Sequence, residues 1–94
     1  MEYEFKTSFD RSLKQMPLFQ KEQIKSAVNH LIDYFETGQR PAGLGLKRLH
    51  GVCWEIRVNI RDRILFSRIK NRVVFLIAGD HDEINRRNMG SLMQ

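Results

Sequence analysis

The residues best suited to chemistry in this 94-residue chain are charged side chains in its second half. Arg57 and Arg63 carry guanidinium groups, whose paired donors match the oxygens of a phosphate. Glu55 can accept a proton, and His81 can give or take one near neutral pH. These residue types together could bind a phosphate group and transfer protons around it.

A structural interpretation stays open for each of these residues. Arg57 and Arg63 could simply be exposed sheet arginines, or they could pair with Glu55 and Asp62. Glu55 could equally be the ion-pair partner of Arg57, and an isolated histidine such as His81 is often a surface residue. The charge distribution helps to choose between these interpretations.

The basic residues are concentrated in the middle of the chain. Residues 39–79 hold nine lysines and arginines against two acidic residues, while residues 1–38 and 80–94 each carry a net charge of −1. Clustered basic side chains neutralise phosphates and release their counterions. A polyanion or an acidic protein is therefore the expected partner.

Two helices are predicted near the N-terminus, after a short strand over residues 2–6. Thr7 is expected to cap the first helix, and Pro17 either breaks that helix or begins the next one. In residues 18–37 apolar side chains recur every three or four positions, which predicts a helix with one buried face. Gly38 is expected to end this helix.

The second half of the chain predicts a sheet. Polarity alternates over residues 54–58 and 63–67, whereas residues 72–78 are apolar on both faces, as in a central strand. Residues 47–50 add a further short strand, after a loop over residues 39–46.

Two shorter features complete the predicted order of elements. Asn71 marks a tight turn, and Asp80 is expected to cap a short C-terminal helix that ends at Gly90. This order predicts an α+β fold with a mostly antiparallel, twisted sheet. Both N-terminal helices are expected on one face of that sheet, because their apolar stripes must be buried.

The strand alternation places the candidate residues on the other face. If the apolar residues of these strands point at the helices, Glu55, Arg57 and Arg63 point away. Arg57 and Arg63 are then neighbours on an open, basic sheet face. The apolar set comprises Trp54, Ile56, Val58, Ile64 and Phe66.

Composition excludes several other classes of protein. With 41% hydrophobic and 29% charged residues, the chain is typical of a folded protein, and residues 1–94 are expected to form a single domain. Cys53 is the single cysteine, which excludes an intrachain disulfide and a thiolate zinc cluster. The longest apolar run has six residues, too few to cross a bilayer, so a cytoplasmic protein is expected.

An ordered set of motifs resembles the RelE/ParE toxin superfamily over nearly the whole chain. The motifs are KRLHG at 47–51, WEIRV at 54–58, RDRILF at 61–66 and VVFLIAG at 73–79. The ending GDHDEI at 79–84 is similar to that of the YafQ branch, which has a histidine followed by an acidic and an aliphatic residue.

The resemblance implies the toxin of a type II toxin–antitoxin system. Such a toxin is a ribosome-dependent endonuclease that cleaves mRNA and inhibits translation, without a metal ion or other cofactor. The implied partners are a cognate antitoxin, the ribosome and mRNA, with no membrane involved. The free toxin is expected to be monomeric and to form a hetero-oligomer with its antitoxin.

The resemblance also implies roles for individual residues. Glu55 and Arg57 match catalytic-face strand residues, Arg63 matches an active-site arginine, and His81 matches the catalytic histidine of the YafQ branch. We therefore expect the two arginines to hold the scissile phosphate, His81 to act as general acid, and Glu55 to be a candidate general base. Contacts to the RNA backbone are expected from Lys47, Arg48 and Arg61.

Two other functions remain open within the same superfamily. One is a ParE-like toxin that inhibits gyrase, although Arg57, Arg63 and His81 together favour a nuclease. The other is an inactive member that only binds an antitoxin, because RelE has a late catalytic tyrosine and no tyrosine follows Tyr34 here.

Overall fold

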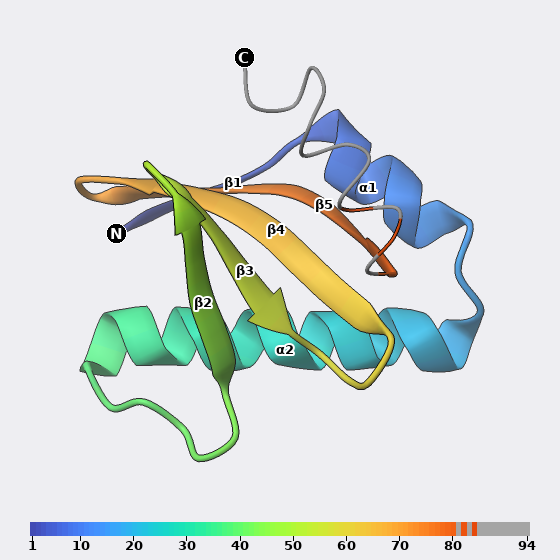
Figure 1. Ribbon diagram of the computed structural model, residues 1–94, viewed down its shortest axis with the longest axis horizontal. Coiled ribbons are helices and arrows are strands. Elements are labelled where there is room, and N and C mark those ends of the chain that lie inside the picture. Colours follow the sequence, from blue (N-terminus) through green and yellow to red (C-terminus); the bar gives the residue numbers. More distant parts are fainter. Residues whose placement is uncertain (81, 83, 85–94) are drawn as a thin grey trace.

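In the part of the chain that the structure describes, five strands form a single sheet, and the longer of two helices crosses one of its faces (Figure 1). The computed structural model describes residues 1–80 together with Asp82 and Ile84. The strand order is β1-β5-β4-β3-β2, with β1 parallel to β5 and the remaining neighbours antiparallel. The elements are β1 (Glu2–Phe5), α1 (Thr7–Lys14), α2 (Leu18–Thr37), β2 (Gly45–His50), β3 (Cys53–Arg57), β4 (Asp62–Ile69) and β5 (Arg72–Asp80). The predicted α+β fold is confirmed.

The helix α2 has the bounds that its apolar periodicity predicts. Its buried side chains are Ile24, Val28 and Leu31, which face the sheet. Gly38 ends the helix in the left-handed conformation, with φ 76°, and its N–H donates to Tyr34 O at 2.8 Å. A residue with a Cβ is disfavoured at this φ, so the glycine stops the helix as expected.

The helix α1 lies beside β5, along the half of that strand that β1 leaves uncovered (Figure 1). The Ser8 hydroxyl donates to Leu76 O, and the N–H of Ala78 donates to Ser12 Oγ at 3.2 Å. Two serine side chains thus provide hydrogen bonds that a neighbouring strand would otherwise make. Phe9 of α1 is buried in the same core cluster as the α2 residues.

The prediction that Thr7 caps α1 is wrong. Thr7 is the first helical residue, and Lys6 occupies the cap position without a side-chain cap. Lys6 lies just after β1 and still bonds to β5, because its N–H donates to Phe75 O at 3.0 Å. Its carbonyl accepts the N–H groups of Phe9 and Asp10, so the chain passes directly from strand into helix.

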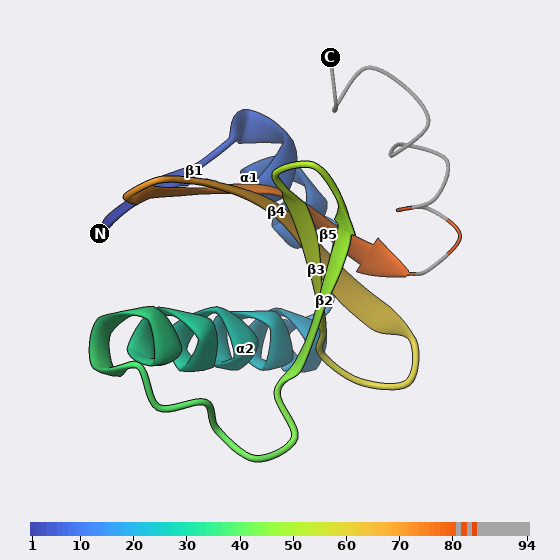
Figure 2. The ribbon, with the colours of Figure 1, turned by 60° about the vertical axis from the view of Figure 1, so that its left-hand side comes forward.

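The strand alternation is confirmed on the face that α2 covers. Ile56, Ile64 and Phe66 are buried there, and Trp54 and Val58 pack against them. In Figure 2 the twisted sheet arches over α2. The second face differs from the expected open, basic surface, because part of it is apolar. A separate buried cluster occupies that part and consists of Cys53, Leu65, Leu76, Ile77 and Ile84.

The turn between β4 and β5 lies where the sequence predicts it, but its left-handed residue is not the expected one. The β4–β5 turn includes Asn71, as predicted, but the residue with left-handed backbone is Lys70, with φ 53°. The helix expected after Asp80 lies outside the described residues, apart from Asp82 and Ile84. No helix of the described chain is both long enough and apolar enough to cross a membrane.

Candidate functional site

Arg57 and Arg63 face each other across β3 and β4, as the alternation predicts. Both guanidinium groups reach the same acceptor in the β3–β4 turn. Arg57 Nε donates to the carbonyl of Asn59 at 3.4 Å, and Arg63 Nη1 donates to the same oxygen at 3.0 Å. One backbone oxygen therefore draws two positive charges together at this end of the sheet.

The two arginines differ in exposure and in partners. The Arg63 side chain is only 14% exposed and forms an ion pair with Glu55, with 3.8 Å between Nε and Oε2. The Glu55 side chain is 13% exposed, whereas Arg57 is exposed. The partner of Glu55 is thus Arg63 and not Arg57, the pairing considered from the sequence. Arg57 is left as the solvent-facing guanidinium of the pair.

A polar network holds the β3–β4 turn against α2. Asn59 Oδ1 accepts the N–H groups of Arg61 at 2.9 Å and Asp62 at 2.8 Å, which closes the turn. Asn59 Nδ2 donates to Gln23 Oε1 at 2.8 Å, and Gln20 Nε2 donates to the Asp62 carboxylate at 3.1 and 3.2 Å. Asp62 is only 1% exposed, so these bonds compensate the cost of burying its carboxylate.

Sequence reasoning missed the role of this network. The segment Asn59 to Asp62 does carry a signal, because Asn commonly accepts N–H groups two or three residues along the chain. The two glutamines of α2 gave no comparable signal, because their contacts span 36 and 42 residues of sequence.

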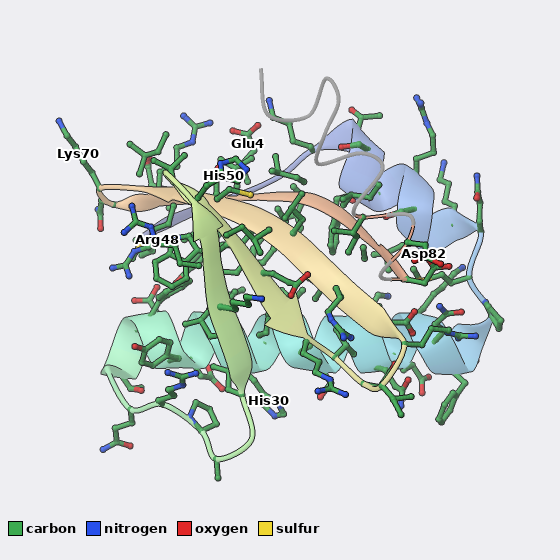
Figure 3. All side chains as sticks on the ribbon, in the orientation of Figure 1. Glu4, His30, Arg48, His50, Lys70 and Asp82 are labelled. Atoms are coloured by element: carbon green, nitrogen blue, oxygen red, sulfur yellow. The ribbon has the colours of Figure 1, made fainter. Side chains whose placement is uncertain are left out.

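The three residues expected to contact the RNA backbone do not form one group. Lys47 lies opposite Glu55 and therefore shares the face of the arginine pair. Arg61 is in the β3–β4 turn, 65% exposed, with its Nε 3.4 Å from Asp62 Oδ1. Arg48 lies opposite Trp54 and donates to Gly51 O at 2.9 Å, near the end of β2 that carries His50 (Figure 3). Arg48 is thus separated from the arginine pair.

His81 lies outside the described residues, so its position in the site stays a prediction. The strand before it does reach the arginine pair. In the β4–β5 register Gly79 lies opposite Arg63, and Asp80 lies opposite Asp62.

Cys53 lies on β3, two residues before Glu55. Burial, with a smaller contribution from Glu55, raises the pKa of the Cys53 thiol and keeps it protonated. Cys53 is fully buried, as a packed side chain would be. Among the described residues, no three histidine, cysteine, aspartate or glutamate side chains gather to hold a metal ion.

Solved structures with this arrangement of elements are toxins of toxin–antitoxin systems. A chain of the DinJ–YafQ complex of E. coli superposes with a TM-score of 0.70 at 19% identity, covering 88% of this chain and 96% of that one. A chain of the RelB–RelE antitoxin–toxin complex of Methanococcus jannaschii gives 0.68 at 16% identity, covering 88% and 95%. The YoeB/ParE toxin of Agrobacterium tumefaciens gives 0.62 at 20% identity, covering 86% and 99%.

These likenesses confirm the predicted RelE-like fold. No protein-family model and no curated protein matches the chain. At 16–20% identity the structural likeness shows the fold alone.

Proposed function

We propose that this chain is the toxin of a type II toxin–antitoxin system and that it cleaves mRNA on the ribosome, without a metal ion, to inhibit translation. The observation that carries the proposal is the arginine pair. Arg57 and Arg63 lie opposite each other beside Glu55, on a fold shared with the RelE, YafQ and YoeB toxins.

The arginine pair fits the electrostatic demand of RNA cleavage. When a 2′-hydroxyl attacks the neighbouring phosphate, negative charge grows on the phosphate oxygens. Exposed Arg57 would bind these oxygens directly. Arg63 is held by Glu55 and by the Asn59 carbonyl, so its charge is already oriented before the substrate arrives.

Proton transfer needs two further groups. We assign His81 as the general acid that protonates the leaving 5′-oxygen. Glu55 can act as the base for the 2′-hydroxyl or can serve only to orient Arg63. The Glu55→Gln variant separates these roles, because glutamine keeps an acceptor oxygen facing Arg63 but takes up no proton.

The proposal includes an antitoxin and the ribosome as partners. The solved complexes pair RelE with RelB and YafQ with DinJ. A segment that neutralises this chain would have to cover the exposed guanidinium of Arg57, which favours an acidic segment. The ribosome would position the message, since positioning alone can supply roughly 7–11 kcal/mol of the barrier.

Primer extension on a defined mRNA tests the proposal. Purified protein that has been treated with EDTA and desalted is added with and without ribosomes, in the Mg²⁺ buffer that ribosomes require, next to the Arg57→Ala/Arg63→Ala double variant as a negative control. We expect cuts that need ribosomes, survive the EDTA treatment of the protein and vanish in the double variant. Absence of ribosome-dependent cutting contradicts the nuclease proposal. A DNA supercoiling assay in parallel then shows whether the chain instead inhibits gyrase.

A further inference from the structure

A cavity of about 490 Å³ opens beside Arg57, on the side of α2 that faces the loop before β2. Gln23, Ser26 and His30 line it from α2, and Pro41 and Leu44 line it from the loop. Figure 3 shows His30 next to the chain that leads into β2. Arg57 belongs both to this lining and to the arginine pair, so the cavity adjoins the candidate site.

The lining combines two kinds of surface. Arg57, His30, Gln23 and Ser26 offer charge and hydrogen-bonding groups, while Pro41, Leu44 and Val58 are apolar. Guanidinium and imidazole groups are planar, and both can stack on the face of a nucleobase. The volume lies in the range of small-molecule sites, roughly 300–1,000 Å³. A nucleotide, which has a flat base and a phosphate group, suits this lining.

Backbone packing holds Arg57 at the mouth of the cavity. Gly45 lies opposite Arg57 in the β2–β3 register, and a Cβ at position 45 would come within 2.9 Å of Arg57 Cβ. The glycine therefore allows the two strands to approach closely at this point. Gln23 Oε1 accepts from Asn59 Nδ2, so the cavity wall is joined to the turn that holds both arginines.

We propose that this cavity binds one nucleotide of the RNA next to the cleaved bond, with its base among His30, Leu44 and Val58 and its phosphate at Arg57. The cavity then sets the nucleotide preference of the cut. This inference rests on the proposed function, because it takes the scissile phosphate to lie at Arg57.

Titration with 5′-mononucleotides tests the cavity apart from cleavage. AMP, GMP, CMP and UMP are titrated separately into ¹⁵N-labelled protein, and shifts are followed for the amides of α2 and residues 41–45. We expect at least one nucleotide to bind at millimolar or lower concentration. Ser26→Phe fills the cavity from an exposed helix position and should weaken binding at least tenfold.

The matched control is Asn29→Phe, an exposed α2 position that does not line this cavity, which should bind as wild type does. His30→Ala gives a second test and should weaken the preferred nucleotide at least threefold. Circular dichroism melting confirms that each variant is folded.

Three results would overturn the inference: no nucleotide binds, Ser26→Phe binds as well as wild type, or inorganic phosphate binds as tightly as the nucleotides. The last result would mean that the base contributes nothing. Nucleotide binding without ribosome-dependent cleavage would instead refute the nuclease proposal and leave the cavity as a nucleotide site. Cleavage without nucleotide binding would refute the cavity alone.

Discussion

Glu55 and Arg63 lie on neighbouring strands and form an ion pair from which solvent is largely excluded, with both side chains less than 15% exposed. Such a pair is costly to break, because the remaining charge stays buried without its partner. The pair also orients the arginine that we place beside the scissile phosphate. Stability and the proposed catalysis would therefore depend on the same contact.

Loss of Glu55 should destabilise the protein measurably. We expect Glu55→Ala to lower the free energy of unfolding by about 1–3 kcal/mol, because Arg63 loses its counter-charge. Urea denaturation measures this change. Glu4→Ala is the matched control, since Glu4 pairs with Arg72 and Lys6 at the surface and should lose less than about 1 kcal/mol. Equal losses of unfolding free energy in the two variants would show that the buried pair stabilises the fold no more than a surface pair does.

Each arginine of the pair should matter for RNA cleavage. Arg57→Ala and Arg63→Ala should each reduce the single-turnover rate on ribosome-bound mRNA by about 10²–10³, because each removes charge aimed at the transition state. Arg57→Ala should keep wild-type stability, since Arg57 is exposed. Arg11→Ala, at an exposed position of α1, is the control and should cleave normally. Full activity in Arg57→Ala would remove this residue from the mechanism.

His81 should set the pH dependence of cleavage. His81→Gln cannot titrate, so we expect a rate about 10²–10⁴-fold lower than wild type. The wild-type pH–rate profile should show an inflection between about pH 5 and 8 that the variant lacks. His50→Gln, at the exposed end of β2 and outside the cavity, is the control, and its profile should keep the inflection. If His81→Gln keeps both the rate and the profile, the mechanism must be built from Arg57, Arg63 and Glu55.

Tyr3 should make the fold sensitive to alkali. Burial, together with a hydrogen bond to Glu36 at 2.8 Å, raises the pKa of Tyr3 from 10.0 to about 12. The raised pKa favours the protonated folded state, so this contribution is complete below pH 10 and is lost as the pH rises through 12. Urea midpoints should fall more steeply above pH 10 in wild type than in Tyr3→Phe. Tyr34→Phe is the control and should follow wild type; parallel curves for wild type and Tyr3→Phe would contradict the coupling.

The proposed antitoxin should bind through charge. Affinity measured by calorimetry over a salt series should fall as salt rises, because the exposed charges around Arg57 are screened. Arg57→Ala should flatten this dependence, while Arg11→Ala should leave it unchanged. An affinity that does not respond to salt would count against an acidic partner segment.

Features that depend on local pattern were predictable from the sequence. The bounds of α2 follow from its apolar periodicity and Gly38, and the opposition of Arg57 and Arg63 follows from alternation about a short turn. Such features need only neighbours close in sequence. The same local patterns set the order of helices and strands, and this order is what the chain shares with the solved toxins.

Features that depend on packing between distant segments were not predictable. The partner of Glu55 depends on which of the two neighbouring arginine side chains turns toward it, and this is set by packing across the sheet. The contacts from Gln20 and Gln23 to the turn and the cavity beside His30 need α2 in its final position. The cap position falls on Lys6 and not on Thr7, because the N–H of Lys6 bonds to Phe75 of β5, a contact that exists only once β5 is in place.

The serine contacts between α1 and β5 have a consequence for the behaviour of the chain in a crowded solution. A sheet edge with unpaired N–H and C=O groups is a template on which a second molecule can add a strand and start an aggregate. Ser8 and Ser12 engage the backbone of β5 where β1 ends, so a helix closes this part of the margin to other chains. At the opposite margin, β2 carries the exposed charges of Lys47 and Arg48, which repel an identical strand. The helix thus blocks strand addition sterically at part of one sheet edge, and charge repulsion disfavours strand addition at the other edge.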